Sequence, residues 1–218
     1  MLYCIIMKRL NIVTGHFGSG KTEFALNLAM QNEGKTTIVD MDTVNPYYRT
    51  ADAKEILRKN GIGVILPQFA NTNVDIPALP SEIFSVFTDK TATVIFDVGG
   101  DEDGALALGQ YYRYLTAEDY EMFFVVNGRR PLTREPEGVI EILREVEAAS
   151  HLRVTKLINS THLGEETTAE IVLEGQKLVE EVSRRTGIPI GFTAVTKDIE
   201  VATENPVMQL TLYIKSPF

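Results

Sequence analysis

The chain has little cysteine and no cluster of basic residues, and both scarcities narrow its function. Cys4 is the only cysteine among 218 residues, which excludes a disulfide within one chain and a thiolate-rich metal or iron–sulfur site. The 30 acidic residues outnumber the 21 basic ones, giving a net charge of −9, and there is no basic run. This balance argues against a protein whose main task is to hold nucleic acid or an anionic membrane. We expect a cytoplasmic protein without stable membrane insertion.

The sequence shows no linker and no internal repeat, and we do not expect residues 1–6 to be a targeting segment. Residues 1–6 are apolar, but they have no basic region before them and are too short for the core of a signal peptide. We expect Met7 to be the natural start, with residues 1–6 an extension or an additional edge strand. Because 44% of the residues are hydrophobic, the chain can bury a substantial core, and we predict a single domain over residues 1–218.

One stretch of the sequence carries a specific motif, G-x-x-x-x-G-K-[ST], and lies between a short apolar run and a helical pattern. Glycines at such a loop allow successive backbone N–H groups to wrap a phosphate without an obstructing Cβ. Lys21 would neutralise β- and γ-phosphate oxygens, and the Thr22 hydroxyl would ligate Mg²⁺. The predicted phosphate-binding residues are Gly15, His16, Phe17, Gly18, Ser19, Gly20, Lys21, Thr22 and Glu23.

Apolar segments alternate with amphipathic helical patterns along the rest of the chain. Several of these segments are apolar without alternation, as strands covered on both faces are. The clearest helix follows Thr167, with a capping box at residues 167–170 and a stop at Gly187. The pattern predicts an α/β P-loop NTPase fold: a mostly parallel, doubly wound sheet of about seven strands with helices on both faces. The predicted strands cover residues 11–14, 36–40, 63–66, 93–97, 122–127, 154–158 and 189–195.

Acidic and amide residues follow three of the predicted strands, at the edge where such a sheet binds ligands. A carboxylate at the end of an apolar strand beside a P-loop is what a magnesium site requires, and Asp97 fits this role best. Gly100 would offer a backbone N–H to the γ-phosphate. Aspartate at a strand end is also a common turn or helix-cap residue, and that alternative stays open.

The order of these motifs resembles that of the MinD/ParA/CobQ/CobB nucleotide-binding domains, in the SIMIBI class of P-loop NTPases. The resemblance covers residues 8–195. Besides the P-loop, it rests on Asp40-x-Asp42 after the second strand, Asp97-x-x-Gly100 after the fourth and Asn159 after the sixth.

This resemblance implies roles for single residues. Thr22, Asp42 and Asp97 would arrange Mg²⁺, Asp42 would position or activate the attacking water, and Asn159 would read the adenine edge. The resemblance also implies a homodimer that closes over ATP in many relatives. Two switch segments are implied, at residues 45–49 and 99–104.

One position departs from the family pattern. MinD and ParA relatives place a second lysine directly after the first loop glycine, where it reaches the partner's nucleotide across a dimer. Here that position is His16. A mostly neutral imidazole at pH 7 does not supply the same fixed charge, so nucleotide-driven dimerisation loses support. Packing or water binding by His16 is an equally good interpretation.

These features together predict a Mg²⁺-dependent ATP-binding protein that slowly hydrolyses ATP to ADP and controls an unidentified protein partner, with Lys21 and Asp42 as catalytic residues. No guanine-reading Asn-Lys-x-Asp occurs, which favours adenine. Two alternatives stay open. One is a small-molecule kinase whose acceptor is held by residues 66–80, Arg129 and Arg130, and the other is a non-catalytic, nucleotide-dependent interaction module. For the two arginines, a solvated loop is an equally good interpretation.

Overall fold

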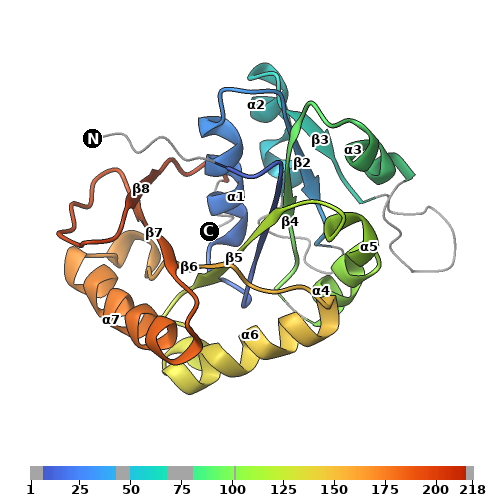
Figure 1. The fold of residues 1–218 in the computed structure, drawn as a ribbon. Coiled ribbons are helices and arrows are strands. Elements are labelled where there is room, and N and C mark those ends of the chain that lie inside the picture. The colour runs from blue at the N-terminus through green and yellow to red at the C-terminus, as the bar shows by residue number, and fades with distance from the viewer. Residues whose placement is uncertain (1–6, 43–49, 68–80, 101, 215–218) are drawn as a thin grey trace, which may run out of the picture.

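A computed structural model describes residues 7–42, 50–67, 81–100 and 102–214. Eight parallel strands form one central sheet with the order β3-β2-β4-β1-β5-β6-β7-β8 (Figure 1). Strands β2 to β4 lie on one side of β1 and strands β5 to β8 on the other, so the strand order reverses at β1. Ligands of such sheets bind at this switch point, beside the carboxyl ends of the strands. The strands are β1 (Leu10–Gly15), β2 (Thr36–Asp40), β3 (Gly63–Ile65), β4 (Thr93–Asp97), β5 (Tyr120–Val126), β6 (Lys156–Asn159), β7 (Ile190–Thr196) and β8 (Val207–Leu210).

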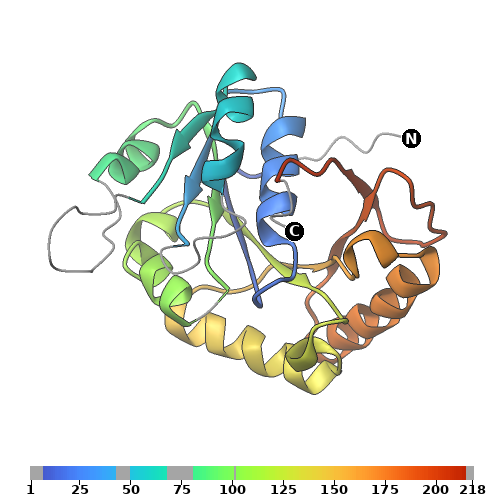
Figure 2. The ribbon, with the colours of Figure 1, turned by 180° about the vertical axis from the view of Figure 1, so that it is seen from behind.

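Helices cover both faces of the sheet, as predicted (Figures 1 and 2). Helices α1 and α2 pack on one face, where their apolar side chains share a core with the strands, and α3 to α7 pack on the other. The helices are α1 (Lys21–Gln31), α2 (Lys54–Lys59), α3 (Ser85–Thr88), α4 (Glu102–Gly109), α5 (Tyr112–Leu115), α6 (Pro136–Ser150) and α7 (Ala169–Thr186). Short 3₁₀ turns are η1 (Thr50–Ala53), η2 (Ser81–Phe84), η3 (Pro131–Thr133) and η4 (Gly164–Glu166).

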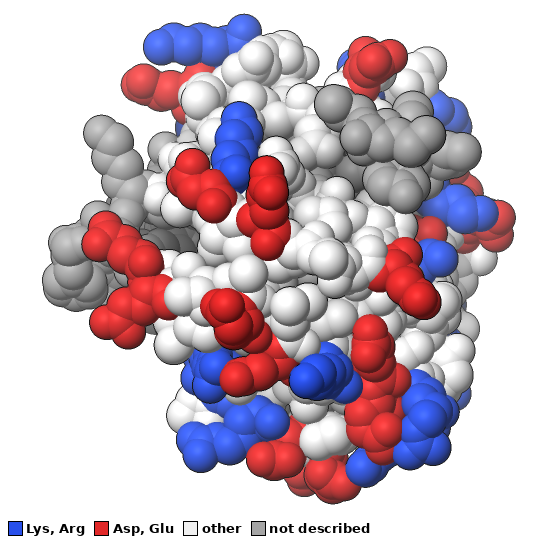
Figure 3. Space-filling model, turned by 90° about the vertical axis from the view of Figure 1, so that its left-hand side faces the viewer, with Lys and Arg blue, Asp and Glu red and all other residues white. Residues whose placement is uncertain are grey.

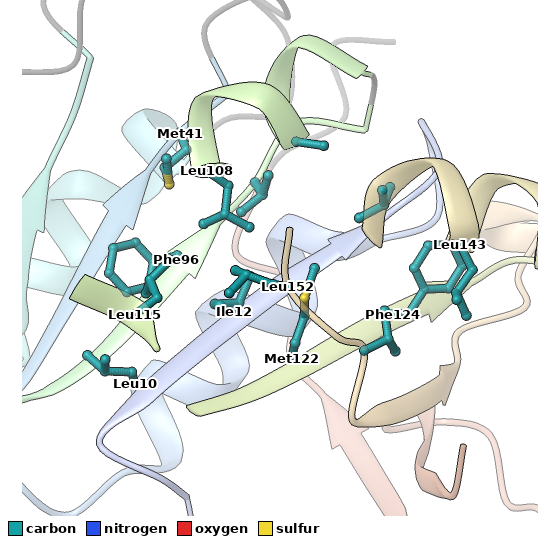
Figure 4. Close-up of a cluster of buried hydrophobic side chains, with 14 of the residues drawn as sticks. Leu10, Ile12, Met41, Phe96, Leu108, Leu115, Met122, Phe124, Leu143 and Leu152 are labelled. Atoms are coloured by element: carbon teal, nitrogen blue, oxygen red, sulfur yellow. The ribbon is translucent and has the colours of Figure 1, made fainter. Parts of the chain in front are cut away.

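The larger core lies under α3 to α7. Figure 4 shows side chains of the central strands, such as Ile12, Phe96 and Phe124, gathered with Leu108 and Leu143 from the covering helices. All five are fully buried. Burial of one such side chain stabilises the fold by about 1.5–3 kcal/mol. Because the central strands bury both faces, their sequences are apolar without alternation, which confirms the basis of the strand prediction.

All seven predicted strands are present, with ends shifted by no more than two residues, but an eighth was not predicted. The additional strand, β8, pairs in parallel with β7 and places Met208 and Leu210 in the core beside α1. The chain then continues along α1. Asn27 exchanges two hydrogen bonds with the backbone of Thr211, at 2.8 and 2.9 Å.

Helix α7 begins one residue later than the predicted cap. Thr168, rather than Thr167, is the N-cap, and its hydroxyl accepts a hydrogen bond from the Ile171 N–H at 3.4 Å. Thr167 instead accepts a hydrogen bond from the backbone N–H of Leu163, so the predicted capping box does not form. The helix ends at Gly187, which adopts the left-handed conformation as predicted.

On the face that carries β8 and α7, the surface shows the mixture of basic and acidic residues that the composition predicts (Figure 3). Figure 3 shows basic and acidic side chains interspersed along the lower edge of this face, where the described basic residues form no patch. Arg185 of α7, for example, pairs with Glu137 of α6 and with Glu181. No helix within the described ranges is both long and apolar enough to span a membrane.

Candidate nucleotide-binding site

The predicted phosphate-binding loop joins the carboxyl end of β1 to the amino end of α1, at the switch point of the sheet. Gly20 is the N-cap of α1 and has φ 88°, a left-handed conformation that favours glycine. The N-cap makes no side-chain hydrogen bond, and the amino end of a helix is a site that binds anions. The Ser19 hydroxyl is buried and has no hydrogen-bond partner within the described residues. A buried hydroxyl of this kind costs about 1–3 kcal/mol, so the loop favours a ligand that accepts its proton.

Lys21 lies across this loop. Its side chain is buried, and Nζ donates a hydrogen bond to the His16 carbonyl at 3.2 Å. The segment after β4 lies directly against the same loop, since a Cβ added to Gly100 would fall 2.6 Å from Lys21 Nζ and 2.7 Å from Phe17 N. Only glycine fits there without movement of the loop backbone. Gly100 therefore lies directly against the P-loop.

A buried carboxylate at the end of β4 forms the second part of the site. The Thr50 hydroxyl donates to Asp97 Oδ2 at 3.0 Å, and Thr22 also hydrogen bonds to this carboxylate. Burial raises the pKa of Asp97 to about 6, although Lys21 and the two threonine hydroxyls act to lower it. The charge of Asp42 raises this pKa further. Thr22 and Asp97 are thus in direct contact, and Asp42 follows β2, which pairs with β4 so that Asp40 lies beside Asp97.

The donors of this cluster fit Mg²⁺. Thr22 offers a hydroxyl oxygen and Asp42 and Asp97 offer carboxylate oxygens, which are the ligands that Mg²⁺ prefers. No cluster of three or more His, Cys, Asp or Glu side chains able to hold a metal occurs in the described part of the chain. This donor set suits an ion that completes its shell with phosphate oxygens and water rather than with protein alone.

Asp40, the last residue of β2, has a local role. Its Oδ1 accepts a hydrogen bond from the Asp42 backbone N–H at 3.0 Å, which shapes the turn that carries Asp42. The Met41 N–H donates to the Asp97 carbonyl at 2.8 Å. These bonds fix the ends of β2 and β4 side by side. The predicted switch segment at residues 45–49 lies outside the described residues.

Two of the predicted nucleotide-binding residues point away from the loop. The Asn159 side chain is fully buried; it donates to the Val172 carbonyl at 3.0 Å and accepts from the Thr161 N–H at 3.1 Å. The Glu23 carboxylate accepts hydrogen bonds from the backbone N–H groups of Tyr213 and Ile214. In this structure both side chains bind the protein itself.

His16 and Phe17 differ in their surroundings. His16 is half-buried, and burial, Lys21 and Arg130 together hold the pKa of its imidazole below the usual value. An imidazole whose pKa is lowered in this way is mostly neutral at pH 7. The Phe17 ring is 58% exposed, so this residue contributes its backbone to the loop and leaves its side chain in solvent.

Three residues that support the loop were not predicted as a group. Asn127 is buried at the end of β5 and donates to the Gly18 carbonyl at 3.4 Å and to the His162 carbonyl at 3.3 Å. His162, which the sequence presented as ordinary, packs against Gly20, since a Cβ there would fall 3.4 Å from its ring. Arg130 Nε donates to the Gly18 carbonyl at 2.8 Å. Of the three, Asn127 directly follows an apolar strand, Arg130 was named from the sequence as an acceptor-binding residue of the kinase alternative, and His162 carried no recognised signal.

Comparison with known proteins identifies the fold. No protein-family model matches the chain, and no curated protein matches it. Among solved structures, cell division protein FtsY from Thermotoga maritima matches with a TM-score of 0.55 and 19% identity, over 88% of this chain and 64% of that chain. Signal recognition particle receptor FtsY from Elizabethkingia anophelis, in complex with GDP, matches with a TM-score of 0.54 and 20% identity, over 85% and 57%. A second structure of that receptor gives 0.52 and 18%, over 89% and 61%.

The present chain spans less than two thirds of the length of each of these neighbours. At these identities the likeness establishes an α/β P-loop NTPase fold, as predicted. It shows the fold alone and does not single out the MinD/ParA/CobQ/CobB group.

Proposed function

We propose that this protein binds ATP with Mg²⁺, hydrolyses it slowly and uses the bound state to control a protein partner. The observation that carries the proposal is the convergence of Asp97 and Gly100 on Lys21 and Thr22 at the carboxyl end of β1. A P-loop with a buried carboxylate and a close glycine from the strand beside it is an arrangement that senses a γ-phosphate. We also propose that the protein works in the cytoplasm.

Each residue of the site has a task in this proposal. The Lys21 ammonium binds phosphate oxygens, and the backbone N–H groups at the start of α1 bind the same anion. Thr22, Asp97 and Asp42 would hold Mg²⁺, which when bound neutralises charge on the phosphates. The Gly100 backbone N–H donates to the γ-phosphate. Asp42, which is less buried than Asp97, orients the attacking water.

The choice of ATP over GTP rests on the sequence at the end of β6. The four residues there are Asn159-Ser160-Thr161-His162, and they do not match the guanine-reading motif Asn-Lys-x-Asp. Because the Asn159 amide is held by Val172 and Thr161, we assign base recognition to groups other than this side chain. GTP is the competing nucleotide, since one FtsY neighbour holds GDP.

The kinase alternative receives less support from the described residues. Its acceptor loop was predicted at residues 66–80, and residues 68–80 lie outside the described part of the chain. Arg129, one of the two arginines assigned to the acceptor, pairs with Glu174 of α7 instead. The geometry at Asp97 and Gly100 favours hydrolysis and switching.

Titration of the purified protein with fluorescent ATP and GTP analogues, with Mg²⁺ or with EDTA, tests the proposal. We expect tighter binding of ATP than of GTP, dependence on Mg²⁺, and a strong loss of affinity in Lys21→Ala without loss of the fold. ADP release without any acceptor supports a hydrolase. Release that requires an added acceptor would support a kinase, and binding without turnover would support an interaction module. Equal ATP affinity of Lys21→Ala and the natural protein would refute the proposed site.

A further inference from the structure

The geometry points to Arg130 as a second phosphate-binding cation, supplied to the P-loop from the loop after β5. This inference rests on the proposed nucleotide-binding function and adds a residue that no loop motif contains. Strand β5 lies directly beside β1, so the residues that follow it emerge next to the P-loop (Figure 1). Of the two adjacent arginines there, the inference concerns only Arg130.

Arg130 is held firmly against the loop. Its Nε donates to the Gly18 carbonyl at 2.8 Å. Its own backbone is fixed by two further hydrogen bonds, from the Arg130 N–H to the Asn127 carbonyl at 3.2 Å and from the Thr133 N–H to the Arg130 carbonyl at 3.1 Å. The Thr133 hydroxyl closes the same turn by donating to the Asn127 carbonyl at 2.6 Å. A long side chain that is anchored at both its backbone and its Nε loses little freedom when it binds a ligand.

The rest of the guanidinium remains available. The Nη1 and Nη2 groups of Arg130 make no hydrogen bond or ion pair within the described residues, and the side chain is exposed. An arginine that binds a neutral carbonyl with Nε keeps its full positive charge and its planar pair of terminal donors, which match phosphate oxygens.

The charge of Arg130 affects the pKa values of two histidines at the loop. It contributes to lowering the pKa of His16, after burial and Lys21, and it also contributes to lowering the pKa of His162, where burial is the main cause. His16 belongs to the loop and His162 packs against Gly20, so the guanidinium lies near both. Two cations, Lys21 and Arg130, thus flank one loop, an arrangement that an anion stabilises.

This placement accounts for the neutral residue at position 16. Arg130, from the same chain, places a fixed positive charge near His16, the second residue of the loop. The same charge favours the neutral form of the His16 imidazole. Arg130 would bind the phosphate chain of the nucleotide and neutralise charge as the γ-phosphate leaves.

Arg129 gives a matched control. It carries the same charge one residue away, but its guanidinium pairs with Glu174 of α7 rather than with the loop. Nucleotide affinity and turnover should be compared for Arg130→Ala, Arg130→Lys, Arg130→Gln and Arg129→Ala, with the melting temperature of each unliganded variant as a check of folding. Inorganic triphosphate, used as a competitor, reports on contacts to phosphate alone.

We expect Arg130→Ala to weaken binding of ATP and of inorganic triphosphate by about tenfold or more, the effect of losing hydrogen bonds to a charged group. Arg130→Lys should recover part of the affinity, Arg130→Gln should not, and Arg129→Ala should match the natural protein. The inference fails if Arg130→Ala binds both ligands like Arg129→Ala. It also fails if Arg130→Gln restores binding, because the residue would then only hold the Gly18 carbonyl. Failure of the natural protein to bind any nucleotide would instead overturn the proposed function.

Discussion

The Thr50 hydroxyl donates a hydrogen bond to Asp97 Oδ2 over 3.0 Å, and both residues are buried. This bond joins η1, the turn before α2, to the carboxyl end of β4. Asp97 therefore accepts hydrogen bonds from two hydroxyl groups, those of Thr50 and of Thr22 in α1. Three segments far apart in the sequence are fixed around one carboxylate.

Removal of the Thr50 hydroxyl should lower the stability of the fold. Thr50→Val keeps the shape of the side chain but leaves a buried carboxylate oxygen short of a donor, at a cost of about 1–3 kcal/mol. Urea unfolding of the unliganded protein at pH 7.5 measures this difference. Thr50→Ser retains the hydroxyl and should lose much less, whereas equal stability of Thr50→Val and the natural protein would contradict the role of the bond.

Asp97 should make stability depend on pH with a definite sign. The pKa of Asp97 is raised to about 6 in the folded protein, so between the ordinary value for aspartate and about 6 the folded state binds a proton that the unfolded state has lost. Its contribution to the free energy of unfolding therefore decreases as pH rises through this window.

Asp97→Asn removes this charge. The stability of the variant relative to the natural protein should be greater at pH 7.5 than at pH 5, as measured by unfolding without Mg²⁺ or nucleotide. A stability difference that is the same at both pH values would mean that the carboxyl titrates normally.

Gly100→Ala should damage the nucleotide site without unfolding the protein. The added Cβ would lie 2.7 Å from the Phe17 backbone nitrogen, so the P-loop must shift. Displacement of reacting groups by about 1 Å can reduce a rate by about 10²-fold. ATP turnover measures the effect, and Gly34→Ala is the matched control because the nearest atom to its Cβ lies 3.6 Å away. Normal turnover in Gly100→Ala would separate this glycine from the site.

Asp42→Asn should separate binding from chemistry. If Asp42 orients the attacking water, ATP still binds while single-turnover hydrolysis falls by about 10²-fold or more. Asp97→Asn should instead weaken Mg²⁺-dependent binding, because the amide lacks the charge that holds the metal. Binding titrations and turnover assays of the two variants distinguish these roles. Equal loss of binding in both would show that the roles are wrongly assigned.

His16 should give an ATP-bound dimer little electrostatic support. Burial, Lys21 and Arg130 all lower the pKa of its imidazole, so it is uncharged at pH 7. We expect ATP with Mg²⁺ to shift the monomer–dimer equilibrium only slightly, and His16→Lys to shift it more. Sedimentation velocity with and without ATP measures both. Strong ATP-driven dimerisation that His16→Ala abolishes would contradict this expectation. It would show that the neutral imidazole supports the dimer as the second loop lysine does in MinD and ParA relatives.

Most of the sheet could be predicted from the sequence because its central strands are buried on both faces and are therefore continuously apolar. Strand β8 could not. It has four residues, and only ten residues (197–206) connect it to its parallel neighbour β7, whereas such connections usually contain a dozen or more. No helical pattern occurs in the sequence between β7 and β8, so nothing there indicated a further parallel strand.

The residues of the candidate site also fall into two groups, those that could be predicted from the sequence and those that could not. The P-loop and the strand-end acids were predictable because local sequence and sheet topology determine where they lie. Thr50 and His162 were not singled out, since only tertiary packing brings them to the loop, and Arg130 was named only as a residue of the kinase acceptor site. Asn159 and Glu23 have the expected positions in the chain, but their side chains point into the protein. A motif specifies which residue follows a strand and leaves the direction of its side chain to packing.

The bonds between α1 and the segment after β8 constrain the order of events during synthesis. Helix α1 leaves the ribosome well before Thr211 and Tyr213, yet Asn27 and Glu23 bind backbone groups of these two residues. Contacts across such long separations form slowly, because the chain between them must first be ordered. A nascent chain with a complete P-loop sequence therefore still lacks part of the support for its first helix. We expect nucleotide to stabilise a chain that includes β8 and the segment after it far more than a fragment that ends before β8.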